Sequence, residues 1–501
     1  MHPQLILDLS HELIVDNFCG GGGVSTGIYE ALGRHADIAI NHSAIAIAMH
    51  AINHPQSTHL QEDVFCVKTR RVTNGRPVGL VWLSPDCRHH SRAKAGKPVN
   101  KKIRGLAWVA LKWAGVGARI IITENVVELQ SWTRLVAKRD KETGRVLRVD
   151  GTVAAVGEHT PLNMQQLVPD TSRTGEYFET WKRELRRLGY AIEHKELCAA
   201  DYGAPTSRVR LFVIARNDGQ AIVWPKETHG DPRKLKAQAR KVLPWRTAAS
   251  CIDFTIPCPS IFLSREEARP FGVRRPLAEA TIRRVGTGVV RYVVKTDRPY
   301  VVTGQEGLRI VPTLIQTGFG ERTGQSPRAP GLGKPIGTIV AGGAKHAVVA
   351  AFLVKHFGGV VGYGLHGAAM HTITARDHHA LGVVELVPMN LAESVCQERI
   401  AAVRALLREC GATDPTMDPT VAEIDGVAYR IVDIGMRMLK PREMYAASSF
   451  PESYIIGDDE TQGLSLTIEQ QIALVGNAVP PLMAKALVAA NCADMAVRKA
   501  A

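Results

Sequence analysis

The sequence contains no C-x-x-C pair, although nine cysteines are scattered from Cys19 to Cys492. This absence argues against a disulfide framework and against a zinc knuckle, because both need cysteines paired at short spacing. No stretch approaches the roughly 20 uncharged apolar residues of a membrane span. The first residues, Met1 to Ser10, lack the basic region that opens a signal peptide. We therefore expect an intracellular, cytoplasmic protein without a membrane partner.

Acidic residues are scarce relative to basic ones. Lys and Arg number 62 and Asp and Glu number 48, which gives a net charge of +14 and a pI near 9.4. Such a balance favours a polyanionic partner, because phosphate binding releases condensed counterions. Charge alone leaves the nature of this partner open. The length of 501 residues indicates two or more domains.

Short β-branched runs alternate with helical patterns in the first 215 residues. This alternation predicts an α/β domain with a largely parallel sheet. Two helices are expected at Val24–Leu32 and Glu176–Leu188, each closed by a glycine. Strands are expected at Leu13–Phe18, Ala36–Asn41, Val78–Leu83, Ile120–Glu124, Tyr190–Leu197 and Val209–Ala215.

The pattern breaks twice along the chain. Residues 131–175 interrupt the alternation with a charged hairpin at Arg134–Val149. We interpret this stretch as a solvated insertion, and contact with a DNA backbone is the alternative. After Asn217, proline, glycine and arginine become frequent and strands shorten, until helical patterns return near the end. We predict a first domain over 1–217, a smaller irregular domain over 218–435, and a closing segment over 436–501 that returns to the first.

A glycine-rich turn, Cys19 to Gly23, joins the first strand to the first helix. Because this turn carries no side chains, a ligand could approach backbone N–H groups at the helix N-terminus. A nucleotide-like cofactor is the expected guest, and a turn without a ligand is the alternative. On this interpretation, Gly22→Val would block the cofactor and leave the fold intact. The G-x-G-x-x-G fingerprint does not fit, since Ser25 and Thr26 stand where a third glycine is needed.

A cysteine follows the strand Val78–Leu83. An isolated cysteine is more often a core residue than a nucleophile. Cys87, however, stands at the carboxyl end of a strand, where open α/β sheets bind ligands. Its neighbours Arg88, His89 and His90 are basic, which favours the thiolate. We therefore regard Cys87 as a candidate nucleophile.

These segments occur in the order typical of one enzyme family, and they resemble the motifs of the DNA (cytosine-5)-methyltransferases. The similar segments are Asp16–Gly23 (D-x-F-x-G-x-G-G), Pro85–Arg88 (P-P-C-Q), Glu124–Val126 (E-N-V), Gly203–Arg210 (G-V-P-Q-x-R-x-R), Arg437–Glu443 (R-x-L-T-x-R-E) and Gly476–Pro481 (G-N-A-V-P-P). The chain departs from the family pattern at Asp86, Arg88 and Thr206.

The resemblance implies a Rossmann-like, S-adenosylmethionine-dependent methyltransferase sheet with a smaller target-recognition domain over 218–435. It also implies a cofactor site. Asp63 would accept from the adenine amine, and His42 stands where the family has an acid for the ribose, which leaves the ribose-binding residue open. The implied cofactor-binding residues are Asp16, Phe18, Gly20, Gly22, Gly23, Asp63 and Asn477.

The resemblance further implies a reaction on cytosine in double-stranded DNA. Cys87 would add to carbon 6 of a base flipped out of the duplex, because carbon 5 is otherwise too electron-poor to take the methyl group. Glu124 would stabilise ring nitrogen 3. Arg208 and Arg210, which alternate along a strand, would contact phosphate and the pyrimidine oxygen. The group that removes the carbon-5 proton is left open.

Two other functions fit the same motifs: an RNA (tRNA) cytosine-5 methyltransferase, and a non-catalytic DNA-binding relative. The histidines from His346 to His379 lack a cysteine or carboxylate pattern to complete a metal site, so no metal is expected. The recognised DNA sequence, a partner restriction nuclease and the oligomeric state are left open.

Overall fold

The computed structural model describes residues 11–85, 105–232, 234, 241–303, 309–317, 321–343, 345–355, 389–424 and 427–497. The chain forms two compact units, Met1–Arg246 with Tyr445–Ala501, and Thr247–Met444. The sequence placed its boundaries after residues 217 and 435. The first unit extends further because a short strand pair, β10 (His229–Gly230) and β11 (Leu243–Pro244), still belongs to it.

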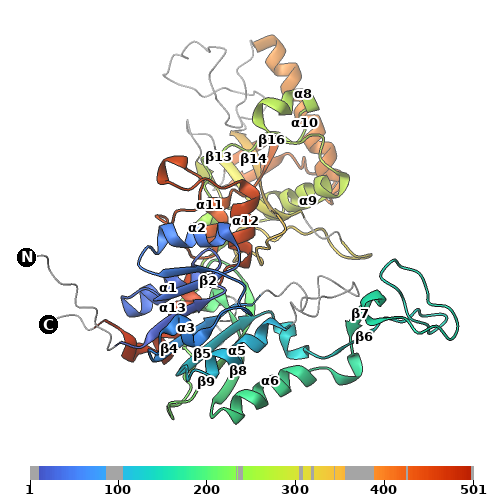
Figure 1. Cartoon of the computed structure of the whole chain (residues 1–501). Helices are drawn as coiled ribbons and strands as arrows, with labels where there is room; N and C mark the ends of the chain where they lie inside the picture. Colours follow the sequence, from blue (N-terminus) through green and yellow to red (C-terminus); the bar gives the residue numbers. More distant parts are fainter. Residues whose placement is uncertain are drawn as a thin grey trace, which may run out of the picture. The chain divides into compact units, whose positions relative to one another are not determined.

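A seven-stranded sheet forms the centre of the first unit (Figure 1). The first five strands in its order run parallel, whereas β9 runs antiparallel to both of its neighbours. In spatial order the strands are β3 (Thr58–Gln61), β2 (Ile38–Asn41), β1 (Leu13–Asn17), β4 (Val78–Leu83), β5 (Ile120–Asn125), β9 (Val209–Arg216) and β8 (Ala191–Cys198). The predicted α/β class and methyltransferase-type sheet are confirmed.

All six predicted strands of this sheet are present, with ends that differ from the predicted ones by at most two residues. The strand that the sequence did not reveal is β3. Its sequence, Thr-His-Leu-Gln, is short, and none of its residues is fully buried. A strand at the edge of a sheet pairs on one side only and lacks the apolar run of a central strand.

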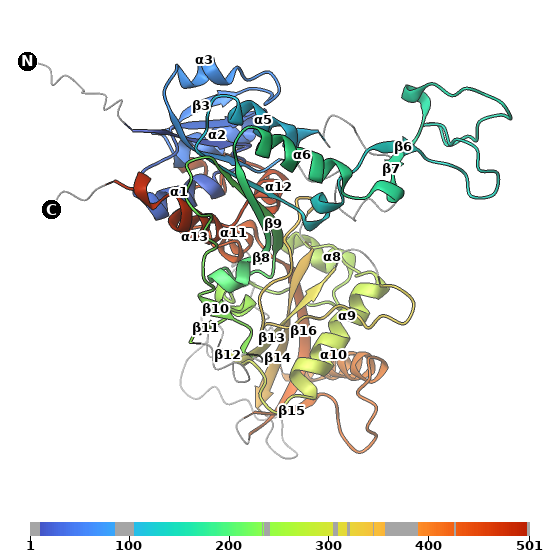
Figure 2. The same cartoon turned by 90° about the horizontal axis from the view of Figure 1, so that it is seen from below.

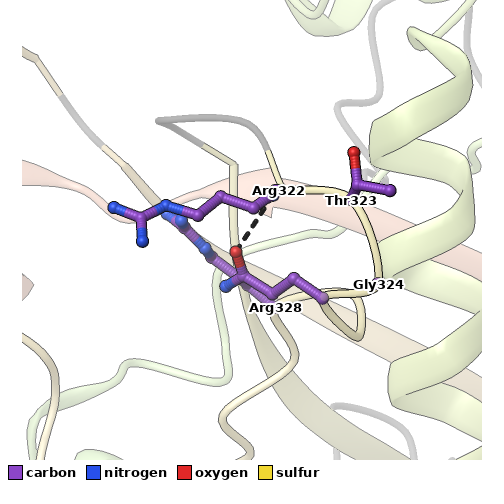
Figure 3. A pocket seen from close by; sticks show the side chains of 5 residues that line it. Arg322, Thr323, Gly324 and Arg328 are labelled. Carbon is purple, nitrogen blue, oxygen red and sulfur yellow. Dashed lines mark hydrogen bonds between the residues drawn. The ribbon is translucent and has the colours of Figure 1, made fainter.

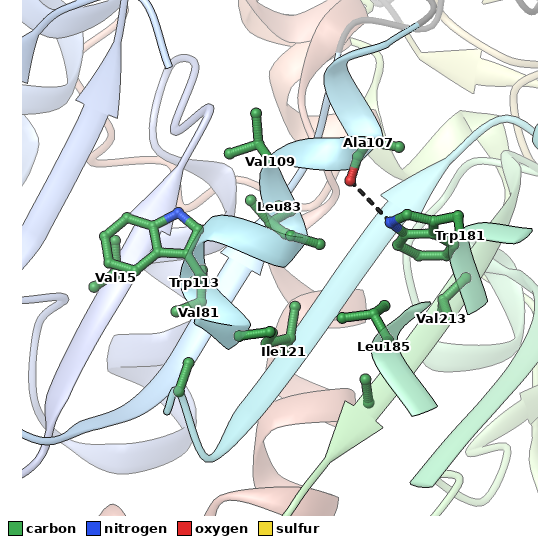
Figure 4. Packing of buried hydrophobic residues seen from close by; sticks show 14 of the residues in the cluster. Val15, Val81, Leu83, Ala107, Val109, Trp113, Ile121, Trp181, Leu185 and Val213 are labelled. Atoms are coloured by element: carbon green, nitrogen blue, oxygen red, sulfur yellow. Dashed lines mark hydrogen bonds between the residues drawn. The ribbon is translucent and has the colours of Figure 1, made fainter. Parts of the chain in front are cut away.

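Helices cover both faces of the sheet, as the alternation of side chains along β1 requires. Ile14 packs with helices α1 (Gly23–Leu32) and α13 (Pro481–Asn491) on one face. Val15 packs on the other face with α5 (Val109–Ala114) and α6 (Glu176–Arg187). Figure 4 shows this second cluster, in which Trp113 and Trp181 are both fully buried.

Three further helices complete the described part of the first unit. They are α2 (Ala44–Asn53), α3 (Thr69–Thr73) and α12 (Ile468–Asn477). The stretch Ile468–Asn491 has the length and hydropathy of a membrane span, with 24 residues and a mean hydropathy of 1.6, but 61% of its most apolar window is buried inside the protein. It is two helices, α12 and α13, separated at Pro480, and both contribute to the core.

An arm, residues 132–175, interrupts the first unit between β5 and α6. It begins with the strand pair β6 (Leu135–Ala137) and β7 (Leu167–Pro169) and continues as turns and isolated bridges. Both views show the arm projecting away from the sheet (Figures 1 and 2). The predicted charged hairpin lies within this arm.

The second unit is a five-stranded antiparallel sheet with helices. The strand order is β12 (Val302–Thr303), β13 (Arg309–Gln316), β14 (His346–Lys355), β16 (Val427–Met438) and β15 (Val421–Ile424). Helices α9 (Glu279–Val289) and α10 (Met389–Glu409) pack with this sheet around an apolar core. The short helix α8 (Arg265–Ala268) precedes them, and α11 (Pro441–Ala447) follows β16.

The core of the first unit gives a stability prediction. The indole Nε1 of Trp181 donates to the carbonyl of Ala107 at 3.0 Å, and both residues are buried. Trp181→Phe removes this donor and leaves a buried carbonyl unpaired, so it should lower the free energy of unfolding by about 1–3 kcal/mol. Denaturant titration measures the change. Tyr177→Phe on the same helix, at a partly exposed residue, is the control and should change stability by less than about 0.5 kcal/mol.

Candidate active site

The candidate site lies at the carboxyl ends of the central strands. The register aligns Asn17 with Leu83 and Leu83 with Thr123 across β1, β4 and β5. These three strands therefore end at one edge, and the residues that follow them meet there. Glu124 is the next residue on β5 and lies opposite Phe212 of β9. The parallel pairing brings Asp16, Asn17 and Glu124 to this edge.

The glycine-rich turn between β1 and α1 has an unusual backbone. Phe18, Gly20 and Gly22 have positive φ angles of 69°, 53° and 92°. This conformation is common for glycine but is strained for phenylalanine, and such strain concentrates at functional sites. A Cβ at Gly20 would meet only the carbonyl of Phe18, at 3.9 Å. Gly20 therefore leaves room beside the backbone.

Gly22 and Gly23 are closed in by other parts of the first unit. A Cβ on Gly22 would lie 2.2 Å from the hydroxyl of Tyr454, and one on Gly23 would lie 2.3 Å from the carbonyl of Val479. The expectation that Gly22→Val leaves the fold intact is therefore wrong. The closing segment fills the space that the sequence assigned to a ligand alone, so packing also requires these glycines.

Asp16 is fully buried and belongs to a chain of polar side chains. The hydroxyl of Ser25 donates to Asp16 Oδ2 at 2.7 Å, and His50 Nε2 lies 2.9 Å from the same hydroxyl. His50 Nδ1 in turn lies 2.8 Å from His59 Nε2. Burial raises the pKa of Asp16 to about 7 and lowers the pKa of His50 well below its usual range. The neutral forms of both groups are therefore favoured by the fold.

Several buried polar atoms near these strand ends have no hydrogen-bond partner among the residues that the structure describes. They are Asp16 Oδ1, both amide atoms of Asn17, Glu124 Oε1 and the Thr206 hydroxyl. An unpaired buried polar atom costs about 1–3 kcal/mol, so native proteins rarely keep several together without a use. Unpaired acceptors and donors of this kind suit a polar ligand. The residues present thus fit a cofactor or substrate that supplies the missing partners.

Asp63 lies in the turn after β3. Its Oδ1 accepts from the N–H of Phe65 at 3.0 Å, which holds the turn closed. Lys112 of α5 supports the same turn, because its Nζ donates to the carbonyls of Val67 at 2.6 Å and Phe65 at 2.9 Å. Sequence reasoning missed Lys112, since a lysine on a short helix is typical of a solvated surface. His42 and Asn477 are both exposed, at the ends of β2 and α12.

Glu124 is 5% exposed and has a guanidinium beside it. Arg210 Nε lies 3.2 Å from Glu124 Oε1, and the contact lacks hydrogen-bond geometry. The next residue, Asn125, donates from Nδ2 to the carbonyl of Pro85 at 3.0 Å. This bond ties the end of β5 to the segment after β4. Cys87, the predicted nucleophile, lies outside the described residues, as do Asp86 and Arg88.

The two predicted arginines differ in their surroundings. Arg208 is buried, and its Nη1 donates to the carbonyl of Gly476 at 3.0 Å. It therefore joins the segment before β9 to the end of α12 in the closing segment. Arg210 is the arginine that reaches the carboxylate of Glu124. Of the pair, Arg210 contacts the carboxylate of Glu124, and Arg208 links two segments that carry sequence motifs.

In the second unit, Arg437 and Glu443 form a buried pair. Two Arg437 nitrogens donate to the two carboxylate oxygens of Glu443 at 2.7 and 2.8 Å. Glu443 also accepts from the backbone N–H of Lys440 at 2.7 Å. The Arg437–Glu443 pair thus joins the end of β16 to the start of α11. Fork-to-fork pairing of this kind fixes geometry as well as contributing energy.

A shallow basic pocket lies on a loop of the second unit. Figure 3 shows Arg322, Thr323, Gly324 and Arg328 around it, with Gln325 accepting from the N–H of Arg322. Glu321, at the start of the loop, is paired with Arg284 of α9 at 2.5 Å. This pairing anchors the loop and leaves its basic residues at the pocket. Such a lining suits phosphate or a base edge.

The described residues contain no group of three or more metal-ligating side chains. Of the predicted histidine series, His346 is described. It is buried, and burial lowers its pKa to about 4. The other members, His356 to His379, lie outside the described residues.

Comparison with known proteins bears on the chemistry of this edge. The model of the C-5 cytosine-specific DNA methylase family matches residues 163–247, which include the Gly203–Arg210 segment. The chain is 20% identical over 254 residues to the type II methyltransferase M.AquIA of Picosynechococcus sp., covering 49% of this chain and 88% of that protein. The chain is therefore similar to the C-5 cytosine-specific DNA methylases over this part of its length. The resemblance and the enzyme class predicted from the motifs are thereby confirmed.

Other relatives of this family cover different shares of the chain. The type II methyltransferase M1.HphI of Haemophilus parahaemolyticus is 26% identical over 219 residues, which is 43% of this chain and 48% of that protein. Among solved structures, the Entamoeba histolytica methyltransferase EhMeth aligns over 95% of this chain and 97% of its own, with 12% identity and a TM-score of 0.43.

Gly22 gives a prediction that separates packing from backbone strain. Gly22→Ala should lower the free energy of unfolding by more than Gly33→Ala, which has a φ of 69° but no atom within 4 Å of its Cβ. Gly33→Ala should lower the free energy of unfolding by only about 1–2 kcal/mol, which is the strain of a left-handed backbone at a residue with a side chain. Adding Tyr454→Phe to Gly22→Ala removes the nearest atom and should recover part of the loss. Equal losses at Gly22 and Gly33 in urea titrations would contradict the packing argument.

Lys112 gives a second prediction. Lys112→Met removes the ammonium that holds the Asp63 turn but keeps the length of the side chain. It should raise the KM for S-adenosylmethionine about tenfold, equivalent to 1.4 kcal/mol, with kcat little changed. Lys68→Met, at an exposed lysine close to the same turn, is the control. A fall in kcat with an unchanged KM would show that Lys112 does not act through the Asp63 turn.

Proposed function

We propose that the protein transfers a methyl group from S-adenosylmethionine to carbon 5 of cytosine in double-stranded DNA, through a covalent adduct with Cys87. The supporting observation is the buried carboxyl of Glu124 at the edge where β4 and β5 end, beside Arg210. The bond from Asn125 to Pro85 links this carboxyl to the segment that leads, two residues later, to Cys87.

A thiolate and a carboxyl are the two groups that this reaction needs from the protein. Addition of the Cys87 sulfur to carbon 6 moves electron density toward ring nitrogen 3 and makes carbon 5 nucleophilic. Glu124 would stabilise nitrogen 3 by sharing a proton with it. Arg210, 3.2 Å from the carboxylate, would orient Glu124 and contact the oxygen of the base. When the methyl group is in place, loss of the carbon-5 proton releases Cys87.

The cofactor would be held at the ends of β1 and β3. Phe18 and Gly20 border the open side of the glycine-rich turn, and Asp16 and Asn17 offer unpaired polar atoms. Asp63 would contact the adenine from its fixed turn, with Gly22, Gly23 and Asn477 completing the site. S-adenosylmethionine supplies an electrophilic methyl sulfonium when bound. The described residues would position this group and exclude water from it.

Residues 218–435 would choose the DNA sequence. Base-edge contacts specify a site, whereas phosphate contacts position the protein. The basic loop with Arg322 and Arg328 offers both kinds of donor on the second unit. Flipping the cytosine out of the duplex costs a few kcal/mol. Contacts from a chain with a net charge of +14 would offset this cost. An intracellular, DNA-associated location follows from this role.

A trapping experiment tests the mechanism. DNA with 5-fluorocytosine at the target should form an adduct that survives denaturation and maps to Cys87, because fluorine cannot leave carbon 5 as a proton. Cys87→Ser should lose both adduct and turnover while still binding S-adenosylmethionine, since a hydroxyl ionises far less than a thiol. Glu124→Gln should bind the cofactor and turn over about 10²- to 10⁴-fold more slowly.

The same experiment separates the alternatives. An adduct at a different cysteine, or full turnover by Cys87→Ser, would rule out the proposed mechanism. Methyl transfer to tRNA but not to duplex DNA would identify an RNA enzyme on the same scaffold. Binding of duplex DNA without transfer to mixed-sequence genomic DNA would identify a non-catalytic relative.

A further inference from the structure

The arm, residues 132–175, has no part in the reaction described above. It is anchored at its base, where Trp132 is buried in the core of the first unit and β6 pairs with β7. Arg134 Nε donates to Asp170 Oδ2 at 2.9 Å across this base. The arm therefore has a defined origin on the first unit.

Beyond its base the arm has almost no core. Between Leu135 and Asp170, the buried residues are Ala154, Thr160 and Asp170. Turns closed by side chains hold its shape instead, since Asp140 accepts from Thr143 and Asp150 accepts from Thr152. With so little apolar surface buried, the arm contributes little to the stability of the unit. Because stability does not explain the arm, we infer that it contacts a partner.

The outer hairpin of the arm is basic. Residues 138–148 contain five cationic side chains and two acidic ones. One of the two acids, Asp140, is used to close the turn with Thr143. Arg139 and Lys141 are exposed, and the turn that Asp140 closes lies between them and Arg145. Arg148 is paired with Glu158, and Arg139 donates to the carbonyl of Gly144 within the turn. The hairpin thus carries Arg139, Lys141 and Arg145 around a preformed turn, an arrangement that suits phosphate groups.

The arm also starts at the reacting edge of the sheet. The end of β5 carries Glu124 and Asn125, a short helical turn at Val127–Ser131 follows, and β6 begins the arm. On the proposed function, a base bound at Glu124 lies next to the strand end from which the arm arises. The hairpin extends away from the sheet in both views (Figures 1 and 2).

We propose that the Lys138–Arg148 hairpin binds the phosphate backbone of DNA that flanks the methylated site. This inference rests on the proposed function. The hairpin adds affinity and orientation without reading sequence, because phosphate contacts carry no base information. Its contribution depends on the length of the duplex, since only DNA that reaches beyond the target can meet the arm.

The test compares two duplexes of the same target sequence, one with minimal flanks and one extended by about ten base pairs on each side, or about 34 Å. The variant is Arg139→Ala/Lys141→Ala/Arg145→Ala. On the long duplex it should weaken binding and reduce the slope of log K against log salt by about 2 to 3, which corresponds to three lost phosphate contacts. On the short duplex its affinity and its methyl transfer should equal those of the wild type.

A matched control uses three exposed arginines of α6, in the variant Arg183→Ala/Arg186→Ala/Arg187→Ala, which removes the same charge from the same unit. This control should keep the wild-type slope on both duplexes. An equal loss in both triple variants would assign the effect to net charge and overturn the proposal. A loss in the arm variant on the short duplex as well would also overturn it, because the hairpin would then act at the target.

A second variant replaces residues 138–165 with a short Gly-Ser linker. If it loses the length dependence and keeps transfer on the short duplex, the proposal stands. If sedimentation shows that it turns a dimer into a monomer with DNA affinity unchanged, the arm is a contact between copies of the chain and the proposal fails. A wild-type protein that methylates DNA with no length dependence defeats the arm proposal alone. One that neither methylates nor binds DNA defeats the proposed function as well.

Discussion

The first unit depends on the contact between its closing segment and the glycine-rich turn at its beginning. Tyr454 donates to the carbonyl of Gly21 at 2.6 Å, and the backbone of Val479 lies where a side chain on Gly23 would be. Helix α13 packs along α1 on the same face of the sheet. The sheet is therefore covered by helices from early and late parts of the chain, and the second unit, Thr247–Met444, is inserted between two segments of the first.

This contact also shapes the candidate site. Because the closing segment seals the side of Gly22 and Gly23, the open side of the turn is the one bordered by Phe18 and Gly20. Arg208 makes a second contact with the closing segment, because it ties the segment before β9 to Gly476. Two ends of the chain are thus fixed against each other before any ligand binds. A preorganised edge of this kind spares the bound ligands the cost of ordering the protein.

Several polar side chains at this edge of the sheet make only part of the hydrogen bonds that they could make. Asn17, Glu124 and Thr206 are buried and have side-chain atoms without a hydrogen-bond partner among the described residues. In Asp16, Oδ2 accepts a hydrogen bond from Ser25 and Oδ1 accepts none from these residues. The apolar core around the sheet contributes the stability that tolerates this loss. The candidate site thus coincides with a cluster of buried polar atoms that lack partners among the described residues, which is the pattern expected when a ligand completes a site.

The sequence by itself determined the class of the fold, the family and the order of the motifs, because periodicity and short motifs are local properties. It placed Glu124 and Asp16 at strand ends, since a strand and the residue after it are contiguous. The antiparallel direction of β9, the edge strand β3 and the support of the Asp63 turn by Lys112 were decided by tertiary structure. So was the packing of Tyr454 against Gly22, whose positions are more than 400 residues apart. Spacing along the chain carries no information about such contacts, because they form only when distant segments share one core.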